Sequence, residues 1–113
     1  INKNRQKIAK LYNKLIINKK ITLLNYSESC VYHQYVILTK EKKKLIKIFN
    51  DKGIQYGFHY PFAIHQLKIF RKFFKYDKFR NSEQMARDGI SIPIDPNLSK
   101  KDVLYIIKTL NEF

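Results

Sequence analysis

The sequence has few of the residues on which disulfides, phosphate-binding loops and membrane spans depend. Its only cysteine is Cys30, which excludes an intrachain disulfide and makes a reducing, cytoplasmic compartment the simpler expectation. Three glycines leave no glycine-rich loop to cradle a phosphate. No apolar run approaches the roughly 20 residues that span a bilayer, so no membrane segment is expected. The chain starts at Ile1 without a methionine, which suggests a segment of a longer polypeptide.

Acidic residues are also scarce, because 9 Asp and Glu stand against 23 Lys and Arg, for a formal charge of +14. Such a charge attracts polyanions. The same net charge would also result from a compositional bias toward lysine, with attraction limited to small anionic ligands. Both interpretations stay open on charge alone, whereas the 44% hydrophobic content places the chain among globular proteins.

Hydrophobic periodicity and capping signals predict an alternation of helices and strands. Thr39 and Ser99 are the expected helix N-caps, and Gly53 the expected left-handed C-cap. The predicted helices are 4–18, 40–50, 64–74, a fourth that Ser82 caps and that runs through Arg87, and a final helix after Ser99 striped by Val103, Ile106, Ile107 and Leu110. The predicted strands are 30–38, 54–59 and 89–94, with 19–29 as a connection. Three short strands among amphipathic helices predict one domain, 1–113, with a two-layer α/β sandwich fold.

The histidines and the cysteine do not form a metal or nucleophile motif. Cys30 and His33 would lie on opposite faces of a strand, and no carboxylate cluster accompanies His59 or His65. Cys30 has no base at a recognisable spacing. We therefore expect neither a metal site nor a self-contained enzyme.

One segment, GIQYGFHYPFAIHQ (53–66), concentrates aromatic rings and imidazoles beside Pro61. His59, Tyr60 and His65 would suit a pocket in which rings pack a sugar or base and imidazoles bind hydroxyls or phosphates. Half-buried core residues that shape a loop would produce the same pattern. The residues alone leave the two interpretations equal.

A second segment, KIFRKFFKYDKFR (68–80), interleaves cations with rings, as surfaces that bind single-stranded nucleic acids do. An amphipathic helix that buries Phe and exposes Lys has the same pattern. No helix-turn-helix, RNA-recognition or zinc-finger signature accompanies it. A free-standing basic module that binds nucleic acid is therefore the alternative hypothesis.

Four pieces, in order, resemble the C-terminal domain of the DegT/DnrJ/EryC1/StrS family of pyridoxal-phosphate-dependent sugar aminotransferases. They are NRQKIAKLYNKLI, SCVYHQYVILTKEKKKLIKIFNDKGIQ, the GI…HYP…IH pattern, and SEQMARDGISIPIDPNLSKKDVLYIIKTLNEF. Ala63 and Arg80 stand where the family usually has proline. The resemblance covers nearly the whole chain and implies the small, mainly antiparallel three-stranded sheet with flanking helices of that domain.

The resemblance also implies a supporting role in a longer enzyme. No residue matches the family's cofactor lysine, so the large PLP-binding domain is absent and the fragment alone should be inactive. The parent would use PLP to move an amino group from glutamate to a nucleotide-linked keto sugar, as a homodimer. His59 and Tyr60 are the implied substrate contacts, followed by His65 and Gln66. A related PLP-dependent sugar dehydratase is a further alternative.

Overall fold

The described chain forms three helices beside one antiparallel sheet of three strands. The computed structural model describes residues 3–23, 34–58 and 87–113. The elements along the chain are α1 (Lys3–Leu15), β1 (Ile21–Leu23), β2 (Tyr35–Thr39), α2 (Lys42–Lys52), β3 (Gly89–Ile92) and α4 (Lys100–Glu112). The strand order is β1-β2-β3, and both neighbouring pairs are antiparallel. This confirms the predicted α/β fold with its small antiparallel sheet.

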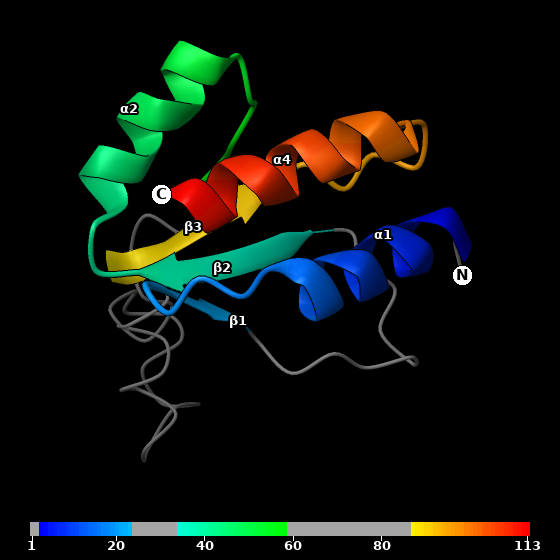
Figure 1. Ribbon diagram of the computed structural model, residues 1–113, viewed down its shortest axis with the longest axis horizontal. Coiled ribbons are helices and arrows are strands. Elements are labelled where there is room, and N and C mark those ends of the chain that lie inside the picture. Colours follow the sequence, from blue (N-terminus) through cyan, green and yellow to red (C-terminus); the bar gives the residue numbers. More distant parts are fainter. Residues whose placement is uncertain (1–2, 24–33, 59–86) are drawn as a thin grey trace, which may run out of the picture.

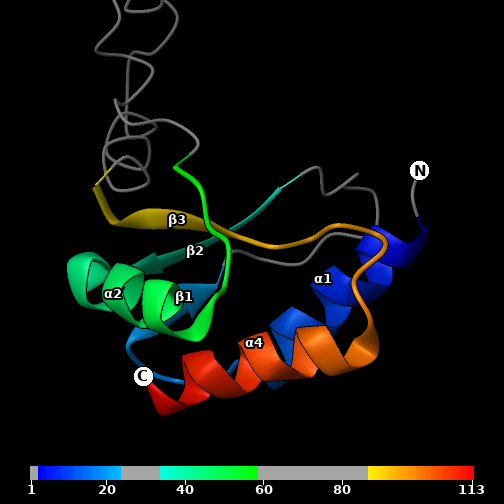
Figure 2. The same cartoon turned by 90° about the horizontal axis from the view of Figure 1, so that it is seen from above.

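The helices lie against one face of the sheet (Figures 1 and 2). Ile37 of β2 pairs with Leu23 on one side and with Ile90 on the other, so one row of apolar side chains crosses the sheet. Ile37 and Ile90 are fully buried. The helices contribute the other large part of this core: Ile8, Ala9, Tyr12, Leu45, Phe49, Val103, Ile106, Ile107 and Leu110.

Two predicted helix caps are confirmed. Gly53 follows α2 with a φ of 70°, in the left-handed region that glycine adopts without strain. Its N–H and that of Ile54 donate to carbonyls of the last turn of α2. At the start of α4, the Ser99 hydroxyl accepts a hydrogen bond from the Asp102 N–H at 3.1 Å. Short-range chemistry therefore sets these two helix ends.

The predicted N-cap at Thr39 is wrong. Thr39 is the last residue of β2 and pairs with Ile21. Its hydroxyl accepts from the Glu41 N–H at 3.2 Å, while α2 begins at Lys42 with Glu41 as its N-cap. Pairing with β1 extends the strand by one residue and moves the helix start along the chain.

The predicted connection 19–29 contains β1, which the prediction missed. β1 has three residues, too few for the alternation by which a strand is recognised in a sequence. Residues 21–23 form a strand because they pair with β2, and a local sequence pattern does not encode that pairing.

The predicted strand 54–59 is also wrong within the described residues. Only Gly57 pairs, in an isolated antiparallel bridge with Ser91. The next hydrogen-bonded pair in this register would place Gln55 opposite Pro93, and proline has no N–H to donate. Pro93 therefore prevents this pairing from continuing from Gly57 back towards Ile54.

The remaining predicted elements that can be compared are present, with different ends. α1 ends at Leu15, before the predicted residue 18, and β2 falls inside the predicted strand 30–38 apart from Thr39. The predicted helix 64–74, and 82–87 up to its last residue, lie outside the described residues. Within residues 3–23, 34–58 and 87–113, no helix combines the length and apolar composition needed to cross a bilayer.

Candidate functional site

The residues predicted to bind substrate lie outside the described part of the chain. His59, Tyr60, His65 and Gln66 belong to 59–86, as does the aromatic and basic segment 68–80. Cys30 and His33 are outside it as well. The described chain reaches Phe58, which is covalently bonded to His59. The surroundings of Phe58 are therefore the part of this predicted site that the structure describes.

The chain just before Phe58 is held against β3 by its backbone. The Gly57 N–H donates to the Ser91 carbonyl at 3.1 Å, and the Ser91 N–H donates to the Gly57 carbonyl at 2.8 Å. A shallow groove of ≈ 230 Å³ lies along this bridge, between residues 55–57 and 91–95. The bridge fixes the direction in which the backbone reaches Phe58.

A cluster of side chains meets at this point, and we call it the stem corner: Lys40, Lys42, Phe58, Arg87 and Asp88. The Lys42 ammonium lies 4.5 Å from the centroid of the Phe58 ring. It also donates to the Arg87 carbonyl at 3.5 Å. Lys42 thus contacts the chain at both positions that border 59–86.

Asp88 is the buried acid of the stem corner. It is 5% exposed, and its carboxylate accepts from the Arg87 guanidinium at 3.1 and 3.3 Å. The Lys40 ammonium lies 3.6 Å from its second oxygen. The hydrogen bond from Arg87 lowers the pKa of Asp88, an effect that burial partly opposes. Asp88 is therefore an anion at neutral pH and is suited to hold neighbours rather than to carry protons.

For Lys42, burial rather than a charged partner has the larger effect on the pKa. Partial burial lowers the pKa of its ammonium, and the charge of Asp88 opposes this shift. A cation that has lost part of its hydration interacts more strongly with a ring face or a carbonyl. Lys42 is also the first residue of α2, at the positive end of the helix dipole.

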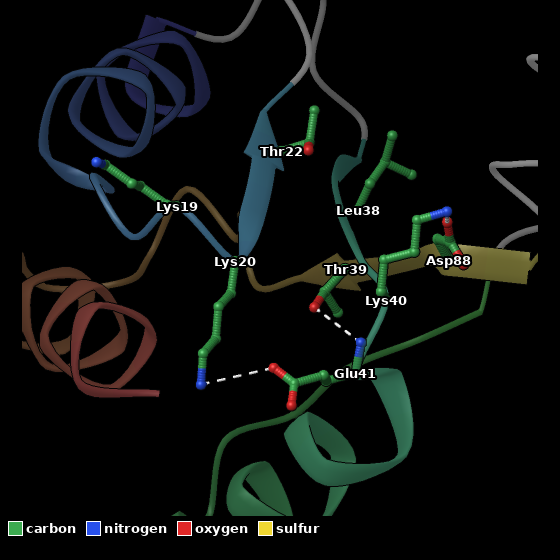
Figure 3. Close-up of a pocket in the computed structure, with 8 residues that line it drawn as sticks. All are labelled: Lys19, Lys20, Thr22, Leu38, Thr39, Lys40, Glu41 and Asp88. Carbon is green, nitrogen blue, oxygen red and sulfur yellow. Dashed lines mark hydrogen bonds and ion pairs between the residues drawn. The ribbon is translucent and has the colours of Figure 1, made fainter.

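A cleft of ≈ 360 Å³ adjoins the stem corner and shares Lys40 and Asp88 with it (Figure 3). Besides these two, the cleft is lined by Lys19, Lys20, Thr22, Leu38, Thr39 and Glu41. Its carboxylates are paired, because Lys20 lies 3.6 Å from Glu41 and Lys40 lies 3.6 Å from Asp88. Figure 3 shows Lys19 directed away from both pairs. The cleft therefore has a small excess of positive charge.

Within the described residues, this arrangement shows no catalytic apparatus. No group of three His, Cys, Asp or Glu side chains in the described ranges is placed to hold a metal. Sequence reasoning did not single out Lys40, Lys42 or Asp88. The only signal was the dense lysine run between residues 40 and 47, and the contacts of Lys42 join it to residues far along the chain.

Comparison with known proteins adds the family. The sequence model of the DegT/DnrJ/EryC1/StrS aminotransferase family matches residues 1–111. The chain is 28% identical over 114 residues to a dTDP-3-amino-3,6-dideoxy-alpha-D-galactopyranose transaminase of Aneurinibacillus thermoaerophilus, which covers 99% of this chain and 31% of that protein. It is 30% identical over 116 residues to a GDP-perosamine synthase of Escherichia coli O157:H7, covering 96% of this chain and 30% of that one.

Solved structures share the fold. DesV of S. venezuelae, solved with a ketimine intermediate, matches with a TM-score of 0.81 at 24% identity, over 98% of this chain and 31% of DesV. A DegT DnrJ EryC1 StrS aminotransferase from Brucella abortus has the same TM-score at 21% identity, over 98% of this chain and 30% of its own. The chain therefore spans about a third of the length of the curated relatives it matches.

Proposed function

Because the chain belongs to the DegT/DnrJ/EryC1/StrS aminotransferase family, we propose that it is the C-terminal domain of an enzyme that aminates a nucleotide-linked keto sugar. The observation that carries this proposal is the match over residues 1–111, nearly the whole chain. Two curated relatives are named for making amino sugars on dTDP or GDP, which supports a nucleotide sugar as substrate. In the proposed reaction, glutamate supplies the amino group.

The cofactor in this proposal is PLP, and residues outside the described ones hold it. The lysines at the described cleft do not fit the cofactor, because Lys20 and Lys40 have side chains 48% and 78% exposed and each is paired with a carboxylate. When bound, PLP supplies the electron sink that amino-group transfer requires. We propose that the single domain 1–113 does no chemistry alone and that a large PLP-binding domain of the same polypeptide completes the enzyme.

We assign His59 and Tyr60 to the wall of the nucleotide-sugar pocket, with His65 and Gln66 as further contacts. The support is indirect, since Phe58 is in contact with the Lys42 ammonium and His59 is the next residue in the chain. Positive charge near the pocket favours a ligand that carries a diphosphate. The role of this domain is to bind and orient the substrate.

The proposal extends to assembly and location. The parent enzyme is a homodimer in the cytoplasm, where nucleotide sugars and glutamate are available to it. Several large apolar side chains of the described part are exposed, which supports contact with further protein. These are Ile17 at 77%, Phe58 at 46%, Tyr105 at 45% and Leu104 at 41%.

The test uses the full-length protein that contains this chain. Incubation with PLP, glutamate and a nucleotide-linked 3- or 4-keto sugar should form 2-oxoglutarate and an amino sugar in equal amounts, measured by mass spectrometry. Loss of a sugar hydroxyl without amine transfer would instead identify a dehydratase. Tight binding to single-stranded DNA that weakens steeply with salt, with no amine transfer, would identify a nucleic-acid module.

A further inference from the structure

Lys42 joins two parts of the chain that are distant in sequence. Its ammonium lies 4.5 Å from the Phe58 ring centroid and 3.5 Å from the Arg87 carbonyl oxygen. The first of these residues precedes 59–86 and the second follows it. One side chain of α2 therefore contacts both borders of the segment that contains the proposed substrate contacts.

The geometry suits a fixing role. A lysine ammonium within about 6 Å of a ring centroid is attracted by the negative face of the ring. A carbonyl is a good acceptor for one of the remaining N–H groups, so the two contacts do not compete. Lys42 is partly buried, so water competes less with both contacts and each is strengthened.

Two neighbouring contacts also restrain the chain next to Phe58 and at Arg87. The Gly57–Ser91 bridge fixes the backbone before Phe58, and Arg87 is bound to the buried Asp88. The Phe58 ring itself is 46% exposed and has contacts with Lys42 and with Tyr56, whose ring centroid is 5.8 Å away. Without Lys42, its χ1 and χ2 angles would have less to restrain them.

We propose that Lys42 is a positioning residue for substrate binding, which holds Phe58 and the Arg87 carbonyl together and so sets where the chain enters His59 and Tyr60. This inference rests on the proposed function, because it takes His59 and Tyr60 as contacts of the nucleotide sugar. Adjacent Cα atoms are about 3.8 Å apart, so a displacement of Phe58 is passed directly to His59.

The chain offers a matched control. Lys43 follows Lys42 on the same helix turn, has the same charge, and is exposed. Lys42→Met keeps most of the side-chain length and a good helix former while removing the charge. Lys42→Arg keeps a cation that can stack on a ring and donate to a carbonyl.

The kinetic test uses the full-length enzyme with saturating glutamate. Lys42→Met should raise the KM for the nucleotide sugar roughly tenfold, equivalent to about 1.4 kcal/mol, with kcat and the KM for glutamate changed less than about twofold. Lys42→Arg should restore the KM to within about twofold of wild type, and Lys43→Met should leave it unchanged. An unchanged KM in Lys42→Met, or an equal loss in Lys43→Met, would overturn the positioning role.

A structural test separates this inference from the proposed function. With ¹³C-labelled lysine in the full-length protein, the Lys42 ε-methylene signal should be shifted upfield by the Phe58 ring, and Phe58→Leu should abolish that shift. Absence of the shift overturns the inference even if the enzyme is active. An active wild type with an unaltered KM in Lys42→Met overturns the inference alone, whereas an inactive wild type overturns the proposed function.

Discussion

Asn18, which follows α1, binds the end of α4, and Asn111 of α4 binds the end of α1. The Asn18 amide donates to the Leu110 and Phe113 carbonyls at 2.9 and 3.0 Å, at the end of α4. The Asn111 amide donates to the Leu15 carbonyl at 2.8 Å, at the end of α1, and its oxygen accepts from the Ile17 N–H at 2.8 Å. Figure 1 shows that α1 and α4 run side by side in the same direction.

Parallel helices bring their negative dipole ends together, which is unfavourable unless donors are supplied. The two amides supply them. We therefore expect Asn111→Ala to lower the free energy of unfolding by about 1–2 kcal/mol, because it leaves a carbonyl of α1 without its donor. Urea unfolding followed by circular dichroism measures the change.

Glu112→Gln is the control for this variant, since the neighbouring carboxylate is 64% exposed and pairs only weakly with Lys108. The double variant Asn18→Ala with Asn111→Ala should lose less than the sum of the two single losses, because each amide supports the same junction. Strict additivity would show that the two caps act independently.

Asp88 should make stability depend on pH at the acid end. Its pKa in the folded chain lies below the ordinary value of 3.8, because Arg87 and Lys40 favour the carboxylate. The stabilisation is therefore present above the unfolded-state pKa and is lost as pH falls through the lower, folded-state value. At pH 7, Asp88→Asn should lower the free energy of unfolding by about 1–2 kcal/mol. Urea unfolding at pH 7 and near pH 3 should show this difference shrinking in acid, and a difference independent of pH would contradict the assignment.

The hydroxyl of Tyr12 should contribute more to stability than an exposed one. Tyr12 is fully buried and donates to the Pro93 carbonyl at 2.5 Å, which joins α1 to the residue after β3. Tyr12→Phe leaves that carbonyl without this donor, so we expect a loss of about 1–2 kcal/mol. Tyr105→Phe is the matched control, because its hydrogen bond to Lys52 is exposed. Equal effects in urea unfolding would contradict the role of burial.

Burial also raises the pKa of the Tyr12 phenol. A raised folded-state pKa means that the stabilisation is complete below about pH 10, the unfolded-state value, and is lost as pH rises above it. Tyrosinate absorbance during an alkaline titration should therefore show Tyr12 ionising together with unfolding. Ionisation of every tyrosine in a chain that stays folded would contradict this.

Gly53 should tolerate alanine less well than Gly57. Alanine at Gly53 meets no atom within 4 Å but must keep a φ of 70°, so we expect a loss of about 1 kcal/mol. Gly57 has no positive φ, and an added Cβ would lie 4.0 Å from the Ser91 Cβ, an ordinary contact. Thermal unfolding of the two variants tests whether backbone conformation, rather than space, decides.

Two of the helix caps and the long helices were predictable from sequence because their causes are local. Ser99 and Asp102 are three residues apart, and Gly53 directly follows the helix it ends. The errors have distant causes. Thr39 joins the sheet through Ile21, and Pro93 prevents residues 54–56 from pairing with the chain after β3.

The candidate site also has features with local causes and features with distant causes. The ring and imidazole pattern at His59 and Tyr60 could be read locally, and its role in substrate binding remains a proposal. The contacts of Lys42 could not be read from the sequence, because Arg87 lies 45 positions away. In a run of lysines, the sequence does not indicate which lysine contacts a particular carbonyl or ring.

The meeting of Phe58 and Arg87 at one lysine also bears on how such a domain diversifies. Because Phe58 and Arg87 meet at Lys42, the segment between them can be replaced without changing the spacing of α2 and β3. Under the proposed function, selection can change the choice of sugar between these two residues while the helices and sheet stay constant. Chimeras joined at Phe58 and Arg87 would be the natural unit for redesigning specificity.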